Sequence, residues 1–248
     1  MSKIIAHITD THLGDPSALD RGANPKKNLK AVLENIALDK FDDLVITGDL
    51  AVKEDLEWLF TKLEDYKPGF KITLGNHDVF KDVIPYYHGT RSQSETELYY
   101  THEDEFYKYI YMDSSSGEIS EAQMAWLTSE INTLKKIIVF IHHPILGFPT
   151  GVDTAYPLKN RDMINEILQE SRQPVTVFCG HYHMPDKRID RKITQYITPS
   201  VAFQVKKNSP TIEVNVNSFA YRIITLEENS IKTSLVTNFY DRFTKKSG

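Results

Sequence analysis

Apolar positions along this chain follow two alternating patterns. Short runs rich in β-branched residues predict buried strands at residues 4–8, 44–47, 70–74, 137–141 and 175–179. Between these runs, apolar residues recur every three or four positions, as on one face of an amphipathic helix. The predicted helical stripes are Leu29, Val32, Leu33 and Ile36; Leu56, Leu59, Phe60 and Leu63; Met124, Leu127, Ile131 and Leu134; and Met163, Ile164, Ile167 and Leu168.

The pattern changes after Gly180. Apolar residues there alternate with polar ones, which is typical of half-exposed antiparallel strands, and no helix is expected. An early alternation of strands and helices followed by a strand-rich portion predicts the α/β class, with two packed mixed β-sheets flanked by helices. The alternating positions are Ile212, Val214 and Val216, followed by Phe219, Tyr221 and Ile223.

The length of the chain, 248 residues, suits one domain with a single extended core. We expect one domain over residues 1–248, with a core at 1–236 and a polar tail at 237–248. Turn formers or charges without apolar periodicity indicate mobile loops in three further segments. These segments are residues 15–25, 85–97 and 148–158.

Composition and charge argue against a membrane or nucleic acid partner and bear on the cellular location. No apolar run approaches the roughly 18 residues of a membrane span, and His7 interrupts the first run, which therefore lacks a signal-peptide core. The lone cysteine, Cys179, excludes an internal disulfide, so we expect a protein of the cytoplasm. The net charge of −5 argues against binding to nucleic acid, which needs an excess of lysine and arginine. The strand-rich C-terminal portion offers an edge for a homodimer.

Polar residues directly follow each of the five predicted strands. Ligands of open α/β sheets gather at the carboxyl ends of strands, so we expect these residues to converge on one crevice. Asp10 and His12 lie two positions apart, as do His181 and His183, and extended backbone would point both members of each pair to the same side. The five clusters are Asp10 and His12; Gly48 and Asp49; Gly75, Asn76, His77 and Asp78; His142 and His143; and Gly180, His181 and His183.

The donor atoms of these clusters indicate transition metals. Oxygen and imidazole donors without thiolates suit Mn, Fe or Zn as divalent or trivalent ions. Seven donors exceed the roughly four protein ligands of one tetrahedral ion, so we predict two ions, and a carboxylate such as Asp49 is able to bridge them. Gly48, Gly75 and Gly180 would let the backbone approach an ion or a phosphate, although each also fits an ordinary turn. The predicted ligands are Asp10, His12, Asp49, Asn76, His142, His181 and His183.

At these residues the chain resembles the calcineurin-like metallophosphoesterase superfamily. The motifs Asp-x-His, Gly-Asp, Gly-Asn-His-Asp, His and Gly-His-x-His occur here complete and in order. The resemblance implies a four-layer sandwich and a phosphoesterase with two metal ions. It assigns Asp10, His12, Asp49 and His183 to one ion, and Asp49, Asn76, His142 and His181 to the other.

The chain is also similar to class III cyclic nucleotide phosphodiesterases. The similarity rests on Met112-Asp113-Ser114, on Gly117 and on the segment Ser120 to Leu127, and it extends through Thr198-Pro199-Ser200 to Tyr221-Arg222-Ile223. It implies a small phosphoester substrate, either a 3',5'-cyclic nucleotide such as cyclic AMP or a similar diester.

The mechanism that the family implies is in-line attack by a metal-bridging hydroxide. His77 would protonate the leaving oxygen, and Asp78 would orient the His77 ring. Asn76 and His77 would also contact the substrate. These roles follow from the resemblance and from the neighbouring positions of the three residues.

Other functions stay open at this point. The first alternative is a phosphodiesterase or phosphatase for another small ester, such as a glycerophosphodiester or a nucleotide. Its specificity would lie in the predicted loops, with Arg21 among the candidates. A non-catalytic scaffold of the same fold is the alternative outside the enzymes, and the complete ligand set argues against it.

The remaining histidines and the cysteine are interpreted as structural residues. In extended chain, His143 would point away from its neighbour His142, so it is either structural or faces the substrate. His7, His88 and His102 carry no motif, and a structural role is favoured for all three. Cys179 lies in an apolar run, which predicts an inert thiol.

Overall fold

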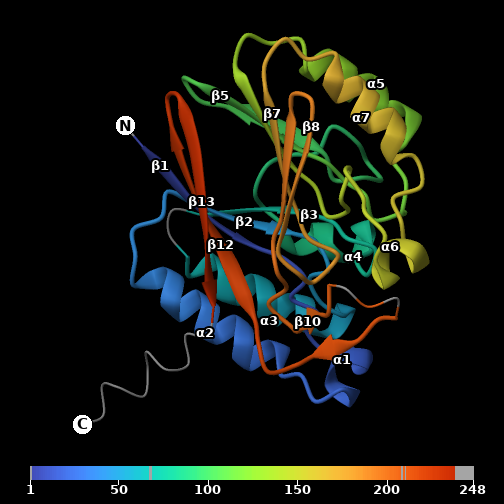
Figure 1. Cartoon of the computed structure of the whole chain (residues 1–248). Coiled ribbons are helices and arrows are strands. Elements are labelled where there is room, and N and C mark those ends of the chain that lie inside the picture. The colour runs from blue at the N-terminus through green and yellow to red at the C-terminus, as the bar shows by residue number, and fades with distance from the viewer. Residues whose placement is uncertain (1, 67–68, 208, 210, 238–248) are drawn as a thin grey trace.

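The computed structural model describes residues 2–66, 69–207, 209 and 211–237. Two β-sheets pack face to face and helices cover their outer faces, so the chain forms four layers (Figure 1). This architecture confirms the predicted α/β class with two packed mixed sheets flanked by helices. Within the described part of the chain, no helix is both long and apolar enough to cross a membrane.

The first sheet has five strands, β1 (Lys3–Ile8), β2 (Asp43–Thr47), β3 (Phe70–Thr73), β12 (Ala220–Glu227) and β13 (Ser230–Thr237). Their order across the sheet is β13-β12-β1-β2-β3. The strands β1, β2 and β3 run parallel, whereas β12 and β13 add antiparallel strands on the other side of β1. The carboxyl ends of the three parallel strands therefore lie at one edge of the sheet.

The second sheet has six strands, β4 (Tyr100–Glu103), β5 (Tyr107–Tyr111), β6 (Lys136–Phe140), β7 (Val175–Cys179), β8 (Asp186–Asp190) and β9 (Ile193–Ile197). Their order is β4-β5-β6-β7-β9-β8, with the four central strands parallel and an antiparallel strand at each edge. A short antiparallel pair, β10 (Gln204–Val205) and β11 (Val214–Asn215), stands apart from both sheets.

Seven α-helices connect the strands of the described chain: α1 (Pro16–Asp20), α2 (Pro25–Ala37), α3 (Lys53–Glu64), α4 (Phe80–Val83), α5 (Glu121–Glu130), α6 (Gly151–Ala155) and α7 (Arg161–Gln169). A 3-10 turn at Ile84–Tyr86 follows α4. The apolar stripes of α2 and α3 pack with the first sheet, and those of α5 and α7 pack with the second. Side-chain oxygens of Asp15 and Asn24 cap the first two helices, which both begin with proline.

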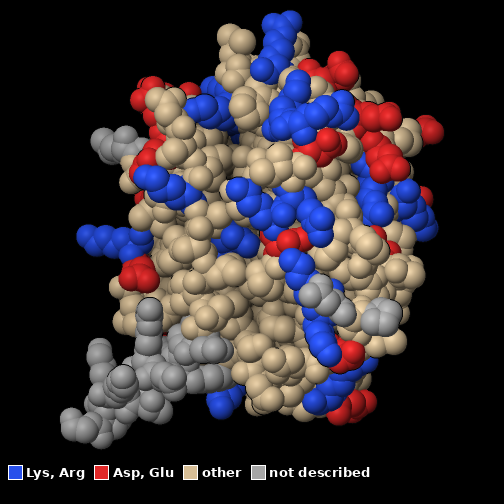
Figure 2. Space-filling model, viewed as in Figure 1, with Lys and Arg blue, Asp and Glu red and all other residues tan. Residues whose placement is uncertain are grey.

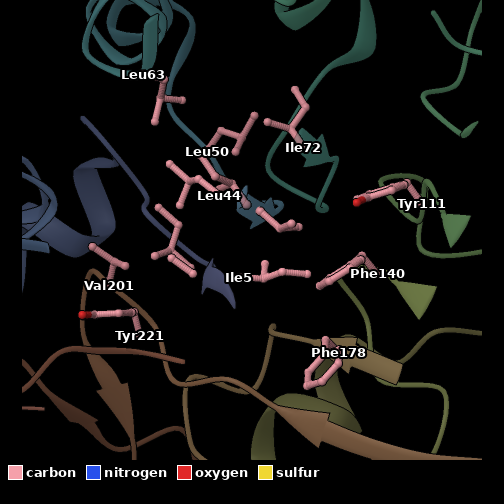
Figure 3. Packing of buried hydrophobic residues seen from close by; sticks show 14 of the residues in the cluster. Ile5, Leu44, Leu50, Leu63, Ile72, Tyr111, Phe140, Phe178, Val201 and Tyr221 are labelled. Atoms are coloured by element: carbon pink, nitrogen blue, oxygen red, sulfur yellow. The ribbon is translucent and has the colours of Figure 1, made fainter. Parts of the chain in front are cut away.

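The core explains why the central strands are apolar without interruption. Side chains of one strand alternate between its two faces, and both faces of β6 are covered. Ile138 and Phe140 pack toward the first sheet, whereas Ile137 and Val139 pack with α5 and α7. Figure 3 shows side chains of the two sheets meeting in the layer between them, where Ile5 lies near Phe140.

Three details differ from the prediction. The third helical stripe ends early, because α5 stops at Glu130 and leaves Leu134 79% exposed. Two segments predicted as loops contain the short helices α1 and α6. The strand predicted around Val214 pairs over two residues only. Residues 238–248 of the predicted polar tail lie outside the described chain.

Candidate metal centre

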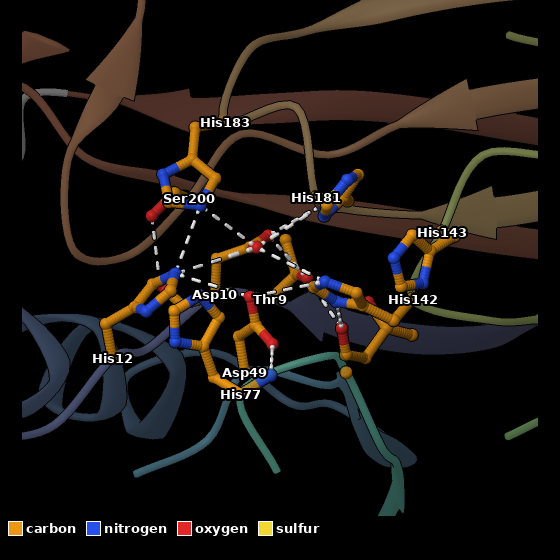
Figure 4. Close-up of polar contacts among 12 residues, drawn as sticks. Thr9, Asp10, His12, Asp49, His77, His142, His143, His181, His183 and Ser200 are labelled. Carbon is orange, nitrogen blue, oxygen red and sulfur yellow. Dashed lines mark hydrogen bonds and ion pairs between the residues drawn. The ribbon is translucent and has the colours of Figure 1, made fainter. Parts of the chain in front are cut away.

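The five predicted clusters come together at the edge where the two sheets present the carboxyl ends of β1, β2, β3, β6 and β7. Figure 4 shows the side chains from these strand ends pointing toward one another. Asp10, His142, His181 and His183 lie within a few ångströms although they come from three different strands. The side chains of the predicted clusters therefore lie together at one edge of the two sheets, as predicted.

One cluster of four buried residues matches the set assigned to the first ion. Potential ligand atoms of Asp10, His12, Asp49 and His183 all lie within 4.8 Å of one another. Nε2 of His183 is 3.1 Å from Oδ1 of Asp10 and 3.1 Å from Nε2 of His12. Two carboxylates and two imidazoles this close together form a donor set suited to Mn, Fe or Zn.

A second cluster adjoins the first through Asp49. Oδ2 of Asp49 lies 3.5 Å from Nε2 of His12 and 3.3 Å from Nε2 of His142. Ligand atoms of His142, His143 and His181 lie within 4.8 Å of one another. One carboxylate thus stands between the two groups of imidazoles, the position that a bridging ligand would occupy.

Each of the four predicted histidine ligands is oriented by a hydrogen bond from its other ring nitrogen. A neutral imidazole donates through one nitrogen and keeps a lone pair on the second, which here faces the site. Outer partners of this kind are usual around metal-binding histidines. The contacts are His12 Nδ1 to Asp15 Oδ2 (3.1 Å), His142 Nδ1 to Thr47 O (2.8 Å), His181 Nε2 to Tyr156 O (2.8 Å) and His183 Nδ1 to Phe203 O (3.1 Å).

The residues of the site fit a metal ion. Nε2 of His142 is buried and has no hydrogen-bond partner among the described residues. An unsatisfied buried polar atom costs about 1–3 kcal/mol, so such atoms need an explanation. A cation that accepts the lone pair of this nitrogen supplies one.

The charges of the site also favour cations. Burial raises the pKa of the Asp10 and Asp49 carboxyls, but the neighbouring imidazoles outweigh burial and hold both pKa values below their usual range. Both carboxylates therefore remain ionised and concentrate negative charge at the centre of the site.

The backbone of the site differs from the extended form that the prediction assumed. Positive φ angles occur at five of the predicted ligands, from 43° at His12 to 68° at His181. Only one other non-glycine residue of the described chain, Arg191, has a positive φ. The paired ligands thus converge through left-handed turns after each strand, and not through the two-residue repeat of a strand. The five ligands are Asp10, His12, Asp49, His181 and His183.

Two of the glycines are required by close packing. A Cβ atom on Gly75 would lie 2.3 Å from Oδ1 of Asp49, and one on Gly180 would lie 2.4 Å from Oδ2 of Asp10. Gly48 has a φ of +75° and faces the backbone of Gly75. These positions therefore need glycine because the neighbouring ligands occupy the space of a side chain.

Asp78 and His77 do not form the predicted pair. Oδ1 of Asp78 accepts from the backbone N–H of Leu50 (2.8 Å), and Oδ2 accepts from that of Gly75 (2.9 Å). Burial and the nearby Asp49 carboxylate raise the pKa of Asp78 to about 7. Asp78 therefore ties together the two loops that follow β2 and β3, one of which carries Asn76.

Asp15 is the acidic neighbour of His77, and sequence reasoning missed it. Oδ2 of Asp15 lies 3.1 Å from Nδ1 of His12 and 3.7 Å from Nδ1 of His77. Its other oxygen accepts from the backbone N–H of Ser17 at the start of α1. The sequence signal was the aspartate before Pro16, since this arrangement is typical of a helix N-cap.

His143 is closer to the site than predicted. Because β6 ends at Phe140, the chain at His143 is not extended, and its ring centroid lies 4.2 Å from that of His181. Nδ1 of His143 is 2.9 Å from the Ser114 hydroxyl.

The structural role expected for His7 agrees with its complete burial between Thr47 and Thr198, each 2.8 Å from a ring nitrogen. Burial also raises the pKa of the Cys179 thiol well above its usual value, as expected for an inert cysteine.

A cavity of about 480 Å³ opens in front of the clusters. This volume lies within the usual range of small-molecule sites. One wall carries the polar site, including Asn76, and half-exposed His77 reaches into the same space. Arg21 also lines the cavity. The apolar residues that line the cavity are Val152, Tyr156, Phe203, Val205, Ile212 and Val214.

Basic side chains gather in the middle of one face of the molecule, with acidic ones among them (Figure 2). Several cations of the described chain are paired. Arg188 and Lys207 both lie 2.8 Å from Asp186, and Lys206 lies 3.1 Å from Glu213. Pairing reduces the charge available to a nucleic acid backbone.

Comparison with known proteins identifies the family. A model of the calcineurin-like phosphoesterases matches residues 4–185, the segment that contains both clusters. The chain belongs to this family. It is accordingly a metal-dependent phosphoric ester hydrolase with clustered histidine and aspartate residues able to bind metal.

The chain is similar in sequence to two curated relatives and in fold to a solved structure. A probable cyclic nucleotide phosphodiesterase of Fibrobacter succinogenes is 25% identical over 236 residues, which cover 93% of this chain and 92% of the relative. A probable glycerophosphodiester phosphodiesterase of Arcobacter nitrofigilis is 24% identical, with 82% and 80% covered. A dimetal phosphatase of Danio rerio has a similar fold, with a TM-score of 0.66, 12% identity, and 93% and 98% of the two chains covered.

Proposed function

We propose that this protein is a two-metal phosphodiesterase that hydrolyses small diesters, with 3',5'-cyclic nucleotides such as cyclic AMP preferred. The observation that carries the proposal is the position of Asp49, whose Oδ2 lies 3.5 Å from Nε2 of His12 and 3.3 Å from Nε2 of His142. A carboxylate between two imidazole clusters is the arrangement of a two-metal site. The relative named as a cyclic nucleotide phosphodiesterase supports the choice of substrate.

The first ion would be held by Asp10, His12, Asp49 and His183, and the second by Asp49, Asn76, His142 and His181. When bound, such ions lower the pKa of a water molecule and neutralise the charge on phosphate oxygens. Mn, Fe and Zn all suit these donors.

His77 is the proposed general acid. Its ring is 53% exposed and lines the cavity beside the ligands, where the leaving oxygen of a substrate would lie. Oδ2 of Asp15 lies 3.7 Å from Nδ1 of His77 and would attract the protonated ring, so that Nε2 would be free to donate its proton to the leaving group. Asn76 lines the same wall and would contact a phosphate oxygen as well as the second ion.

A glycerophosphodiester is the second candidate substrate. The relative from Arcobacter nitrofigilis, which carries that name, covers most of this chain at nearly the same identity as the first relative. The metal centre serves both reactions equally, so the two candidates differ only in the part of the substrate beyond the phosphate.

The proposal is tested by comparing kcat/KM for cyclic AMP, cyclic GMP, glycerophosphoethanolamine and a simple monoester, each with saturating Mn²⁺. We expect the diesters to exceed the monoester by tenfold or more, with the cyclic nucleotides highest. Asp49→Asn should abolish turnover and reduce the bound metal, whereas Asp39→Asn on the exposed surface should change neither. Absence of hydrolysis with any divalent metal would favour a non-catalytic scaffold.

Four further predictions accompany this function. They are a single domain over residues 1–248, a cytoplasmic location, no nucleic acid partner, and a homodimer formed through the C-terminal strands. Size-exclusion chromatography with light scattering tests the last of these, since a monomer at working concentration would contradict it.

A further inference from the structure

Apolar side chains line the cavity together with the candidate metal ligands. We call the side chains of Tyr156, Phe203, Val205, Ile212 and Val214 the apolar shelf. They come from the segment around α6 and from the β10–β11 pair with the residues before its strands, and Val205 lies opposite Val214 in that pair. The candidate ligands and the shelf therefore line one cavity of about 480 Å³.

Contacts with the ligands fix the position of the shelf. The ring centroid of Phe203 is 4.4 Å from that of His183 and 5.7 Å from that of His12. The backbone N–H of Val205 donates to the carbonyl of His183 at 2.9 Å, and the carbonyl of Tyr156 accepts from His181 at 2.8 Å. A group that binds on the shelf would thus lie within a few ångströms of a phosphate bound at the metal centre.

Two side chains of the shelf are exposed to solvent. Ile212 is 40% exposed and Tyr156 is 58% exposed, whereas Phe203 and Val205 are each 6% exposed and most other large apolar side chains of the described chain are buried. Exposed apolar surface inside a cavity is typical of a ligand site, because the ligand covers it on binding.

We propose, building on the phosphodiesterase function above, that the apolar shelf binds the nucleobase of a nucleoside phosphodiester. A flat heteroaromatic ring covers Ile212 and Val214 and stacks beside Tyr156, while the phosphate occupies the polar wall. Stacking and apolar contact of one base increase affinity by about ten- to hundredfold. This preference separates a nucleotide substrate from a glycerophosphodiester.

The test compares cyclic AMP with ribose 3',5'-cyclic phosphate, which carries the same ester without the base. We expect the wild-type protein to show kcat/KM about ten- to hundredfold higher for cyclic AMP. Ile212→Asn should reduce this ratio at least fivefold by raising KM for cyclic AMP, and should leave hydrolysis of the abasic ester unchanged. Ile189→Asn is the matched control, because Ile189 is 64% exposed on β8 and does not line the cavity.

The outcomes separate this inference from the proposed function. Equal kcat/KM of the wild type for both esters would overturn the role of the shelf and leave the phosphodiesterase intact. An unchanged ratio in Ile212→Asn would overturn it as well. If neither ester is hydrolysed, the proposed function fails, and calorimetry with AMP and ribose 5-phosphate still tests the shelf. Equal affinity for these two ligands would then refute it.

Discussion

Replacing Gly180 with alanine tests how tightly the metal centre is packed. A Cβ atom at this position would lie 2.0 Å from Oγ1 of Thr9 and 2.4 Å from Oδ2 of Asp10. The threonine hydroxyl cannot simply rotate away, because it is buried and lies 2.7 Å from Oδ2 of Asp10 and 2.8 Å from the carbonyl of Thr47. The φ of Gly180 is not in the left-handed region, so crowding is the only cost of the change.

The magnitude follows from these contacts. Overpacking a rigid site costs about 1–3 kcal/mol, and weakening the two hydrogen bonds of Thr9 adds about 1 kcal/mol. We therefore expect Gly180→Ala to lose roughly 2–4 kcal/mol of unfolding free energy, or about 4–16 °C in Tm for a chain of this size. Because Asp10 must move, bound metal should also fall at least tenfold at limiting ion concentration.

The assay is thermal unfolding with excess chelator and with Mn²⁺, together with metal analysis of the dialysed protein. Gly117→Ala is the control, since Gly117 has a φ of +75° and open space around it. This control should lose about 1 kcal/mol from backbone strain and no metal. If Gly180→Ala retained its metal and lay within about 0.5 kcal/mol of the wild type, the packing argument would be wrong.

Two further predictions concern single residues. Asp15→Asn should lower kcat for esters with poor leaving groups about tenfold more than for nitrophenyl esters, because only a poor leaving group needs the proton of His77. A loss shared by both esters reports the lost contact with His12, and an equal loss on both would contradict a role of Asp15 at His77. His102 is stacked 4.4 Å from Tyr109, and burial with the nearby lysines lowers its pKa to about 4, below the 6.5 of the unfolded chain. Protonation therefore favours unfolding, so wild-type stability falls as the pH drops from 6.5 toward 4. The phenylalanine of His102→Phe does not titrate, so the unfolding free energy of the variant minus that of the wild type should be about 1 kcal/mol larger at pH 5 than at pH 8, after a discount for partial exposure. Urea titrations at the two pH values measure this difference, and equal differences would refute the prediction.

The sequence predicted β6 and β7, the two innermost strands of the second sheet, because their burial is two-sided; β5 and β9, which contain Lys108 and Gln195, were not predicted. Strands such as β6 and β7 are apolar at nearly every position, and this pattern depends on little beyond the strand itself. The strands β4 and β8 were not predicted. Their sequences, Tyr-Thr-His-Glu and Asp-Lys-Arg-Ile-Asp, are polar because they lie at the edges of the second sheet. Only pairing with a neighbour makes them strands, and that pairing is a tertiary contact.

The two parts of the active-site cavity differ in the same way. The candidate ligands follow predicted strands, so the sheet alone brings them together. Asp15 and most of the apolar shelf come from segments without a periodic pattern. Although Ile212 and Val214 belong to the predicted alternation, the position of the shelf depends on contacts with residues distant in the chain, such as that between Val205 and His183. Local sequence carries no record of such contacts.

The left-handed backbone at the candidate ligands shows why these residues come together although the geometry expected for them was wrong. Each non-glycine residue in this conformation costs roughly 1 kcal/mol, so five together cost about as much as the whole stability of a small domain. The sequence must therefore use residues that tolerate it, and aspartate and histidine are enriched there. Residues chosen as metal ligands are thus also those that permit the sharp turn after each strand. Because the same residue types serve as ligands and tolerate a left-handed backbone, the Asp-x-His and His-x-His motifs can be recognised in the sequence, but the backbone conformation that presents them cannot.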